Sequence, residues 1–224
     1  MLKSCWDRDV AVYDQAVGEA LLDAIVADAE GIARSPNFWV PMESIMQPST
    51  AAEAAISALH RRVLQQHPRC PPALTGAEWW VQVRYPTPPA HHPAPPAHQV
   101  YRPGAGLAFH FDKDEAGFKD TGNMRHPALS SVLYLTGAAE GPPQGPTVVM
   151  RQHFDNERRC TVPEDPEACC IAWPIRGRYL VFDGRLGHGV LESTNQSRRI
   201  TLLVNWWEGA PPQVTWWLID MLLP

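Results

Sequence analysis

Four side chains that lie far apart in the sequence have the chemistry of a metal site with a neighbouring anion-binding group. His110 and Asp112 form a His-x-Asp pair, and His188 and Arg199 follow much later in the chain. Two imidazoles and one carboxylate on one side of a metal leave open positions opposite, the facial arrangement of non-haem Fe(II) sites. Arginine adds a planar fork that bonds both oxygens of a carboxylate and keeps its charge.

The spacing of the first two residues suits a strand. Alternate side chains of a strand share a face, so His110 and Asp112 are expected to project together from a strand over Leu107–Asp112. The segment Arg176–Val190 then predicts a strand, a Gly-rich turn and His188 opening the next strand. Closure of a β-barrel would bring this histidine beside the pair.

Each of these residues also has a structural interpretation. His110 can be an ordinary strand histidine, Asp112 a turn former, and His188 a residue tolerated by the Gly187/Gly189 turn. The joint occurrence of all three, with barrel-like strands between them and an arginine behind, favours metal binding. The other seven histidines lack ordered partners in the sequence and are expected on the surface or in loops.

Two arginines compete for the anion-binding role. Arg199 shares a strand face with the hydroxyl of Thr201, whereas Arg198 shares the opposite face with residues that are typical of a core: Ile200, Leu202 and Val204. This alternation favours Arg199 and leaves Arg198 as the alternative.

Periodicity predicts helices before strands. Apolar positions at three- and four-residue steps predict a helix over Asp14–Arg34, and a capping box at Thr50–Glu53 opens a second helix that ends before His67. Strands are predicted at Trp79–Tyr85, Gln99–Tyr101, Leu107–Asp112, Ser130–Leu135, Thr147–Arg151, Ile171–Trp173, Tyr179–Phe182 and Ile200–Trp207. Loops are predicted at Pro86–His98, Glu140–Pro146 and Asn156–Glu167.

This order predicts an α+β fold in which two helices back the sheet of a β-sandwich or barrel. We expect one domain over residues 1–224, with helical support in 1–70, a β-core in 79–208 and an apolar C-terminal segment in 213–224. The C-terminal segment is expected to pack on the sheet, and a dimer contact is the alternative.

Composition narrows the environment and the partners. The net charge of −5 with scattered signs argues against a nucleic-acid partner, and no apolar run suits a signal peptide or a membrane span. Five irregularly spaced cysteines argue for reduced thiols. We therefore expect a soluble, intracellular, cytoplasmic protein, and the sequence does not settle its oligomeric state.

Several elements, in order, resemble one enzyme superfamily. These elements are Tyr101–Gly104 with His110–Asp112, Val132–Thr136, Gly145–Thr147, Arg176–Phe182 with His188, and Arg199–Thr201. On these elements the chain is similar to the Fe(II)/2-oxoglutarate-dependent oxygenases, and to their prolyl-hydroxylase-like branch. This superfamily is built on a double-stranded β-helix, or jelly roll.

The resemblance implies roles for the candidate residues. His110, Asp112 and His188 would bind Fe(II) as the catalytic centre, while Arg199, with Thr201 beside it, would hold the far carboxylate of 2-oxoglutarate. Tyr134 and Tyr101 would donate hydroxyl hydrogen bonds to that carboxylate, and a buried tyrosine with a satisfied hydroxyl is the alternative for either. Dioxygen is the further cosubstrate, with ascorbate as an optional addition.

The implied reaction is hydroxylation of a C–H bond, or demethylation through hydroxylation. An aspartate at position 112 disfavours a halogenase, in which chloride takes the place of that carboxylate. A protein or peptide side chain is the first expected substrate, and a small metabolite is the alternative. A cupin-like binding module without oxidation is a third hypothesis, and a demethylase acting on nucleic acid is the least favoured.

Overall fold

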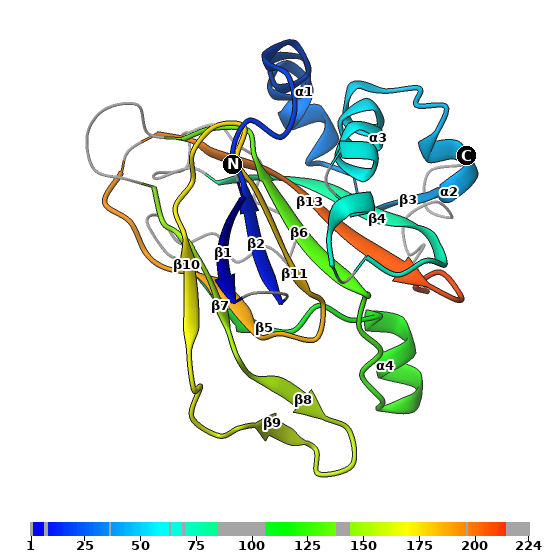
Figure 1. Ribbon diagram of the computed structural model, residues 1–224, viewed down its shortest axis with the longest axis vertical. Helices are drawn as coiled ribbons and strands as arrows, with labels where there is room; N and C mark the ends of the chain where they lie inside the picture. Colours follow the sequence, from blue (N-terminus) through cyan, green and yellow to red (C-terminus); the bar gives the residue numbers. More distant parts are fainter. Residues whose placement is uncertain are drawn as a thin grey trace, which may run out of the picture.

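A computed structural model gives the architecture of the chain (Figure 1). It describes residues 2–6, 9–35, 37–62, 64–68, 70–84, 106–137, 144–195 and 197–213, and residues 2–6 by their backbone alone. The predicted strand Gln99–Tyr101, the predicted loop Pro86–His98 and all of the predicted C-terminal segment except Gln213 lie outside the described residues.

Antiparallel strands form two facing sheets and one projecting hairpin (Figure 1). The seven-stranded sheet contains, in spatial order, β1 (Leu2–Trp6), β2 (Val10–Tyr13), β11 (Tyr179–Asp183), β6 (Leu129–Tyr134), β13 (Arg199–Glu208), β4 (Leu74–Arg84) and β3 (Phe38–Pro41). The four-stranded sheet contains β10 (Cys169–Ala172), β7 (Thr147–Met150), β12 (His188–Val190) and β5 (Leu107–His110). The hairpin pairs β8 (His153–Asp155) with β9 (Cys160–Val162).

Helices cover the outer face of the seven-stranded sheet (Figure 1). These are α1 (Glu19–Ile32), α2 (Met42–Ile45) and α3 (Ala51–Arg62), and a 3-10 turn, η1 (Leu64–Gln66), follows α3. The capping box that opens α3 is present, because the Glu53 amide donates to Thr50 Oγ1 at 3.1 Å and the Thr50 amide donates to the Glu53 carboxylate at 3.2 Å. A further helix, α4 (Glu115–Thr121), follows β5.

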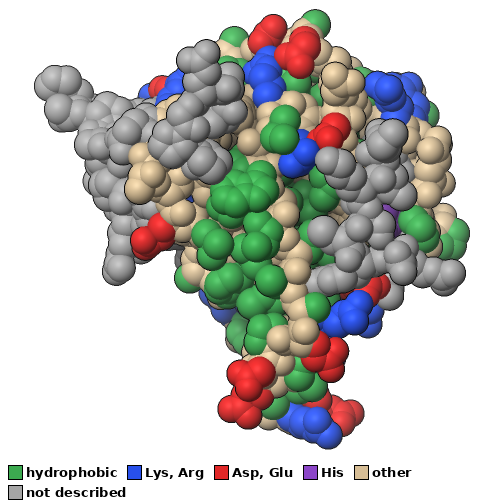
Figure 2. Space-filling view, turned by 60° about the vertical axis from the view of Figure 1, so that its left-hand side comes forward, with side chains coloured by type: hydrophobic (Ala, Val, Ile, Leu, Met, Phe, Trp, Pro, Cys, Tyr) green, Lys and Arg blue, Asp and Glu red, His purple; other side chains and the backbone are tan. Residues whose placement is uncertain are grey.

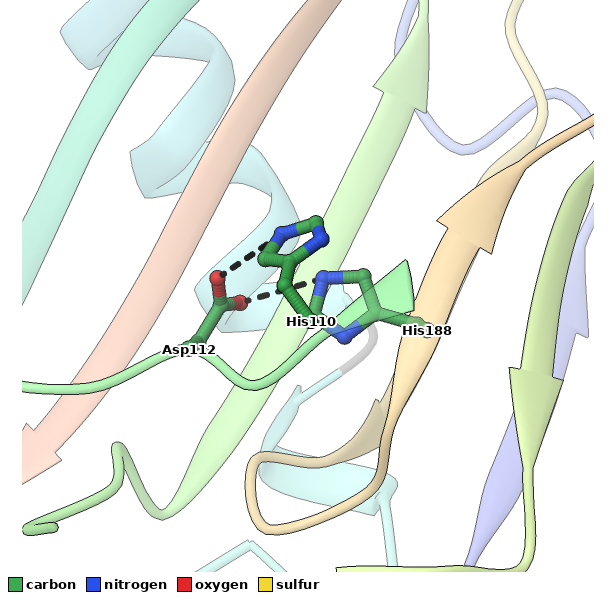
Figure 3. Close-up of side chains that lie close together, drawn as sticks. All are labelled: His110, Asp112 and His188. Carbon is green, nitrogen blue, oxygen red and sulfur yellow. Dashed lines mark ion pairs between the residues drawn. The ribbon is translucent and has the colours of Figure 1, made fainter. Parts of the chain in front are cut away.

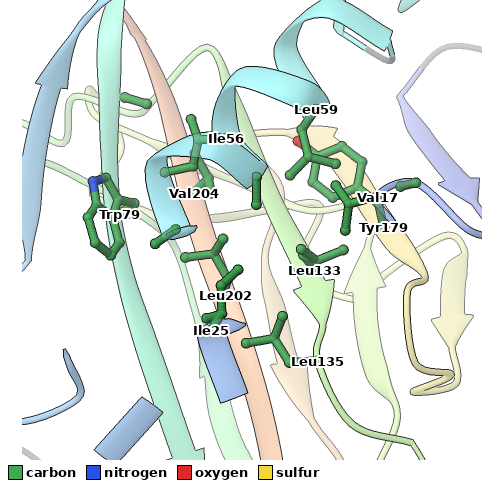
Figure 4. Close-up of a cluster of buried hydrophobic side chains, with 14 of the residues drawn as sticks. Val17, Ile25, Ile56, Leu59, Trp79, Leu133, Leu135, Tyr179, Leu202 and Val204 are labelled. Atoms are coloured by element: carbon green, nitrogen blue, oxygen red, sulfur yellow. The ribbon is translucent and has the colours of Figure 1, made fainter. Parts of the chain in front are cut away.

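The larger hydrophobic core lies between these helices and the sheet (Figure 4). Ile25 of α1 and Ile56 of α3 pack against Leu133, Leu202 and Val204 of the central strands, and all five side chains are fully buried. Apolar burial of this kind contributes about 1.5–3 kcal/mol per large side chain. The helices thus hold the outer face of the sheet and leave its inner face toward the second sheet.

A smaller core fills the space between the two sheets. It contains Val132 and Leu180 of the larger sheet and Val149 and Ala172 of the smaller one. No described helix covers the outer face of the four-stranded sheet, and some apolar side chains of this face are exposed to solvent. Ile171 in β10, for example, is 47% exposed. Figure 2 shows these apolar side chains above the projecting hairpin.

The predicted α+β class with two supporting N-terminal helices is confirmed, with local corrections. The first helix begins at Glu19 and not at Asp14, because residues 14–18 form a turn in which Gln15 has a left-handed φ of 54°. The predicted strand over Leu107–Asp112 ends at His110. The predicted loop Asn156–Glu167 is wrong at β9, which pairs with β8.

The prediction of reduced thiols is wrong at one position. Cys170 on β10 is disulfide-bonded, whereas Cys70, Cys160 and Cys169 are free. In the part of the chain that the structure describes, no helix combines the length and the apolar character that crossing a membrane requires.

Candidate metal centre and anion-binding residues

Strand pairing brings the two candidate histidines together. His188, the first residue of β12, is the register partner of His110, the last residue of β5, so both side chains project from the same face of the small sheet. Their ring centroids lie 4.4 Å apart. Gly189 permits this close pairing, because a Cβ at that position would lie 2.8 Å from the Leu107 carbonyl oxygen.

Asp112 reaches the histidines from the loop that follows β5 (Figure 3). Its Oδ1 lies 3.8 Å from His110 Nε2, and its Oδ2 lies 3.6 Å from His188 Nε2. The potential ligand atoms of the three residues all lie within 4.8 Å of one another. The sequence prediction therefore named the right neighbours, although Asp112 is delivered by a loop and not by strand alternation.

Hydrogen bonds orient each group of this cluster. His110 Nδ1 lies 2.9 Å from the Ala108 carbonyl oxygen, and His188 Nδ1 lies 3.2 Å from that of Leu186. Because a carbonyl only accepts, each Nδ1 carries the hydrogen and each Nε2 keeps its lone pair toward the centre. Backbone partners of this kind are typical of metal-binding histidines.

Asp112 is held both at its carboxylate and at its backbone. Ser130 on β6 donates its hydroxyl to Asp112 Oδ2 at 2.7 Å. His126 Nδ1 lies 2.7 Å from the backbone carbonyl oxygen of Asp112, so the imidazole donates to it. The side chain and the backbone of Asp112 are thus fixed separately, and the carboxylate is aimed at the histidines.

Burial favours the neutral form that a ligand histidine needs. Burial lowers the pKa of His188, the Asp112 charge opposes this change, and the neighbouring His110 adds to it. The Phe182 ring lies 4.8 Å from the His188 ring and limits access by water. Two imidazole nitrogens and one carboxylate facing a common point fit a divalent metal such as Fe(II), with positions left open on the far side.

Arg199 is a buried cation without a carboxylate partner among the described residues. Its Nη2 donates to Thr147 Oγ1 at 3.2 Å, its guanidinium lies 5.4 Å from the centre of the Tyr134 ring, and its Nε has no hydrogen-bond partner. The Oγ1 of Thr201, two residues along the same face of β13, is also buried without a partner. Burial lowers the pKa of Arg199. A buried cation and a free hydroxyl fit an anionic ligand with several acceptor atoms.

Arg198 has a different environment. Its side chain is exposed, and its Nη1 lies 2.6 Å from Glu30 Oε1 of α1. Its charge is already paired on the helical side of the sheet. The structure therefore places Arg199, and not Arg198, on the inner face that the sequence alternation favoured.

Sequence comparisons give no match, whereas structural comparisons give many. No protein-family model and no curated protein matches the sequence. A prolyl-4-hydroxylase from Pseudomonas putida superposes with a TM-score of 0.52 at 16% identity, over 91% of this chain and 94% of that one. SnoN, an α-ketoglutarate-dependent epimerase from nogalamycin biosynthesis, superposes with a TM-score of 0.55 at 12% identity, over 93% and 84%. The chain has the fold of the Fe(II)/2-oxoglutarate-dependent oxygenases. This confirms the predicted jelly roll. At such low sequence identities, the structural similarity shows the fold alone.

Within this oxygenase fold, the two candidate tyrosines differ. The fully buried Tyr134 hydroxyl donates to Thr147 Oγ1 at 2.7 Å and lies 3.2 Å from the Ala172 carbonyl oxygen. Tyr134 therefore matches the alternative interpretation, a buried tyrosine whose hydroxyl already has a partner. To donate a hydrogen bond to a ligand, the Tyr134 hydroxyl would have to break its bond to Thr147. Tyr101 lies outside the described residues.

The sequence did not predict two residues that contact Asp112 in the candidate metal centre. Ser130 was assigned only to a strand, and no spacing rule connects it to Asp112. His126 was expected to be a loop histidine without an ordered partner, yet it holds the Asp112 carbonyl. The expectation of a surface or loop position is wrong for His60, which lies on α3 and stacks on Trp206 at 5.8 Å. His67 does lie in a loop, but its side chain is buried.

Proposed function

We propose that this chain is an Fe(II)- and 2-oxoglutarate-dependent dioxygenase that hydroxylates a C–H bond. The observation that carries the proposal is a pairing of two incomplete sites on the inner faces of the sheets. His110, Asp112 and His188 present free ligand atoms to one point, and Arg199 with Thr201 presents unpartnered donors nearby. A keto acid with a second carboxylate has the groups to complete both sites.

The separation of the two sites can be estimated along β6, from the residues that contact Asp112 and Arg199. Ser130, which holds Asp112, and Tyr134, which packs under Arg199, lie four residues apart on β6, or about 13 Å along the strand. The long Arg199 side chain covers part of this span, and the cosubstrate would cover the rest. When bound, iron and 2-oxoglutarate would supply the oxidation, in which dioxygen and the keto acid yield succinate, carbon dioxide and one hydroxyl on the substrate.

The protein's own side chains would bind, orient and shield. His110 and His188 would provide nitrogen donors, and Asp112 would provide the negative charge that offsets part of the metal charge. Phe182 keeps water away from one side of His188. Arg199 would fix the keto acid by its far end, so that its keto group faces the metal.

A protein or peptide side chain is the first proposed substrate, supported by the prolyl-4-hydroxylase among the structural neighbours. A small metabolite is the second candidate, supported by SnoN, which has also been solved with Fe3+, α-ketoglutarate and nogalamycin RO (TM-score 0.52, 12% identity, 92% of this chain and 89% of that one). A cupin-like module that binds metal without oxidation has no need of a buried Arg199.

The test is succinate formation by the iron-loaded protein with two substrate panels, one of proline-containing peptides and one of free amino acids and small metabolites. The proposal predicts succinate that depends on both iron and 2-oxoglutarate, together with a mass gain of one oxygen atom in a substrate. Stimulation by the second panel alone would overturn the peptide assignment. Failure of the iron-loaded protein to bind 2-oxoglutarate at all would overturn the oxygenase assignment.

A further inference from the structure

A second arginine lies directly opposite Arg199. Arg84, the last residue of β4, is the register partner of Arg199, the first residue of β13. Directly opposed residues of an antiparallel pair have Cβ atoms about 4.5–5.5 Å apart and project to the same face. Both side chains therefore leave the sheet on its inner face, the face that carries Thr201.

These two cations lack a counter-charge in the part of the chain that the structure describes. Arg84 is half-buried, its Nε donates to Gln82 Oε1 at 2.9 Å, and no described carboxylate pairs with it. Arg199 bonds to the neutral Thr147 hydroxyl and leaves its Nε unpartnered. Like charges directly opposite each other on a sheet are destabilising. Burial, and then the charge of Arg199, lower the pKa of Arg84 to about 10.

We propose that Arg84 and Arg199 together bind the far carboxylate of 2-oxoglutarate as a two-arginine seat, an inference that rests on the proposed function. A carboxylate offers about four lone-pair sites, enough to accept from two guanidinium groups at once. One bound anion offsets the repulsion of both cations and takes up the buried Arg199 Nε. The seat selects keto acids that carry a second carboxylate over those that end in a methyl group.

The experiment compares two keto acids that differ only at the far end. The affinities of 2-oxoglutarate and of 2-oxopentanoate, which lacks the second carboxylate, are measured by calorimetry on the Mn(II)-loaded protein. Arg84→Gln is expected to weaken 2-oxoglutarate about tenfold, the value of one charge-assisted hydrogen bond. Binding of 2-oxopentanoate is expected to stay within about twofold, because it makes no bond to the seat.

A matched control and a double variant sharpen the result. Arg198→Gln removes a neighbouring charge on the opposite face and is expected to leave both affinities unchanged. Because the two seat residues would share one anion, Arg84→Gln combined with Arg199→Gln is expected to lose less than the product of the two single losses. A double variant whose losses multiply would contradict a shared carboxylate.

A second readout needs no metal. Removing one of two opposed cations is expected to raise the Tm of the ligand-free protein and to reduce the Tm increase that glutarate produces. If Arg84→Gln does not fold, Arg84→Lys keeps the charge without the fork, and an unchanged ratio of the two keto-acid affinities in that variant overturns the seat.

The outcomes separate this inference from the proposed function. Loss of 2-oxoglutarate affinity in Arg199→Gln but not in Arg84→Gln overturns only the two-arginine seat. Equal losses for both keto acids in Arg84→Gln also overturn it, because the far carboxylate is then not involved. A wild-type protein that binds 2-oxoglutarate no better than 2-oxopentanoate overturns the seat and the cosubstrate assignment together.

Discussion

The two faces of β13 have opposite environments. On the outer face, Ile200, Leu202 and Val204 are fully buried against the helices. On the inner face, Arg199 and Thr201 are equally buried but carry polar atoms without partners. Over its first four residues, Arg199–Leu202, the strand thus alternates between buried polar side chains with unpartnered atoms and apolar side chains packed against the helices; the next inner-face residue, Leu203, is apolar and packs against the smaller core.

This difference separates the residues that support the fold from those that support the site. A buried polar group without a partner costs about 1–3 kcal/mol, and an apolar side chain at the same position would avoid that cost. The outer face follows this rule and the inner face does not. The inner face at Arg199 and Thr201 therefore has polar atoms to which a ligand could bind, which is the basis of the proposed site, whereas the outer face packs against the helices.

The largest expected effect comes from the proposed metal ligands. His110→Ala, Asp112→Ala and His188→Ala should each abolish iron-dependent turnover and metal retention while the fold remains, because the site is carried by sheets that the helices stabilise. Metal content after dialysis, succinate formation and circular dichroism check this. His153→Ala, which removes an exposed histidine on β8, is the control. Stoichiometric metal in all three variants would show that these residues do not bind it.

The outer face should respond in the opposite way. Leu202→Ala leaves a cavity under the helices and should cost about 2–5 kcal/mol of unfolding free energy. The affinity of the folded fraction for 2-oxoglutarate should stay unchanged. Denaturant unfolding and calorimetry measure the two quantities, and a variant that keeps its stability but loses its ligand would break the division between the faces.

Arg199→Gln should weaken 2-oxoglutarate by about 30-fold or more, because truncating a buried charge pair costs about 2 kcal/mol at least. The stability of the ligand-free protein should change far less than in Leu202→Ala. Calorimetry on the Mn(II)-loaded protein measures the affinity, and the exposed Arg198→Gln is the control. An unchanged affinity would favour the cupin-like binding module.

Ser130→Ala should have a smaller effect on the metal. The Asp112 carboxylate loses its hydroxyl donor and should bind metal about tenfold more weakly, as for other residues that orient ligands. Competition with a chelator measures the affinity. The neighbouring Ser131→Ala is the control, because that hydroxyl donates to the Val204 carbonyl on the outer side. Equal losses in both variants would indicate a general effect on β6.

The smallest expected effect is on stability at mildly acidic pH. Burial is the main cause that lowers the pKa of His188, His126 and His60 below 6.5. As the pH falls below this value, the unfolded chain takes up protons that the folded chain does not, so the metal-free protein loses stability. Denaturant unfolding at several pH values checks this. His126→Asn should flatten the dependence and the exposed His153→Asn should not; the reverse result would contradict the burial argument.

The sequence predicted the parts of the site that follow from strand alternation. Arg199 and Arg198 were separated correctly onto two faces because a strand has a period of two. The convergence of His188 with His110 followed from closure of the β-core, although the sequence alone does not give their register. Asp112 was assigned to the right cluster for a wrong reason, since the strand ends before it.

Other features depend on pairings that one strand cannot reveal. Arg84 can be recognised as a site residue only because it lies opposite Arg199, and Ser130 only because it contacts Asp112. The strands β2 and β3 were not predicted from the sequence, and the structure shows them as partners of β11 and β4. Tertiary pairing, and not local propensity, fixes these elements.

The most direct test of the account is a crystal structure of the protein with Mn(II) and 2-oxoglutarate. The account predicts one metal ion bound by the Nε2 atoms of His110 and His188 and by the Asp112 carboxylate, with the far carboxylate of the keto acid against Arg199. A metal ion bound elsewhere, or a keto acid whose far carboxylate does not contact Arg199, would contradict it.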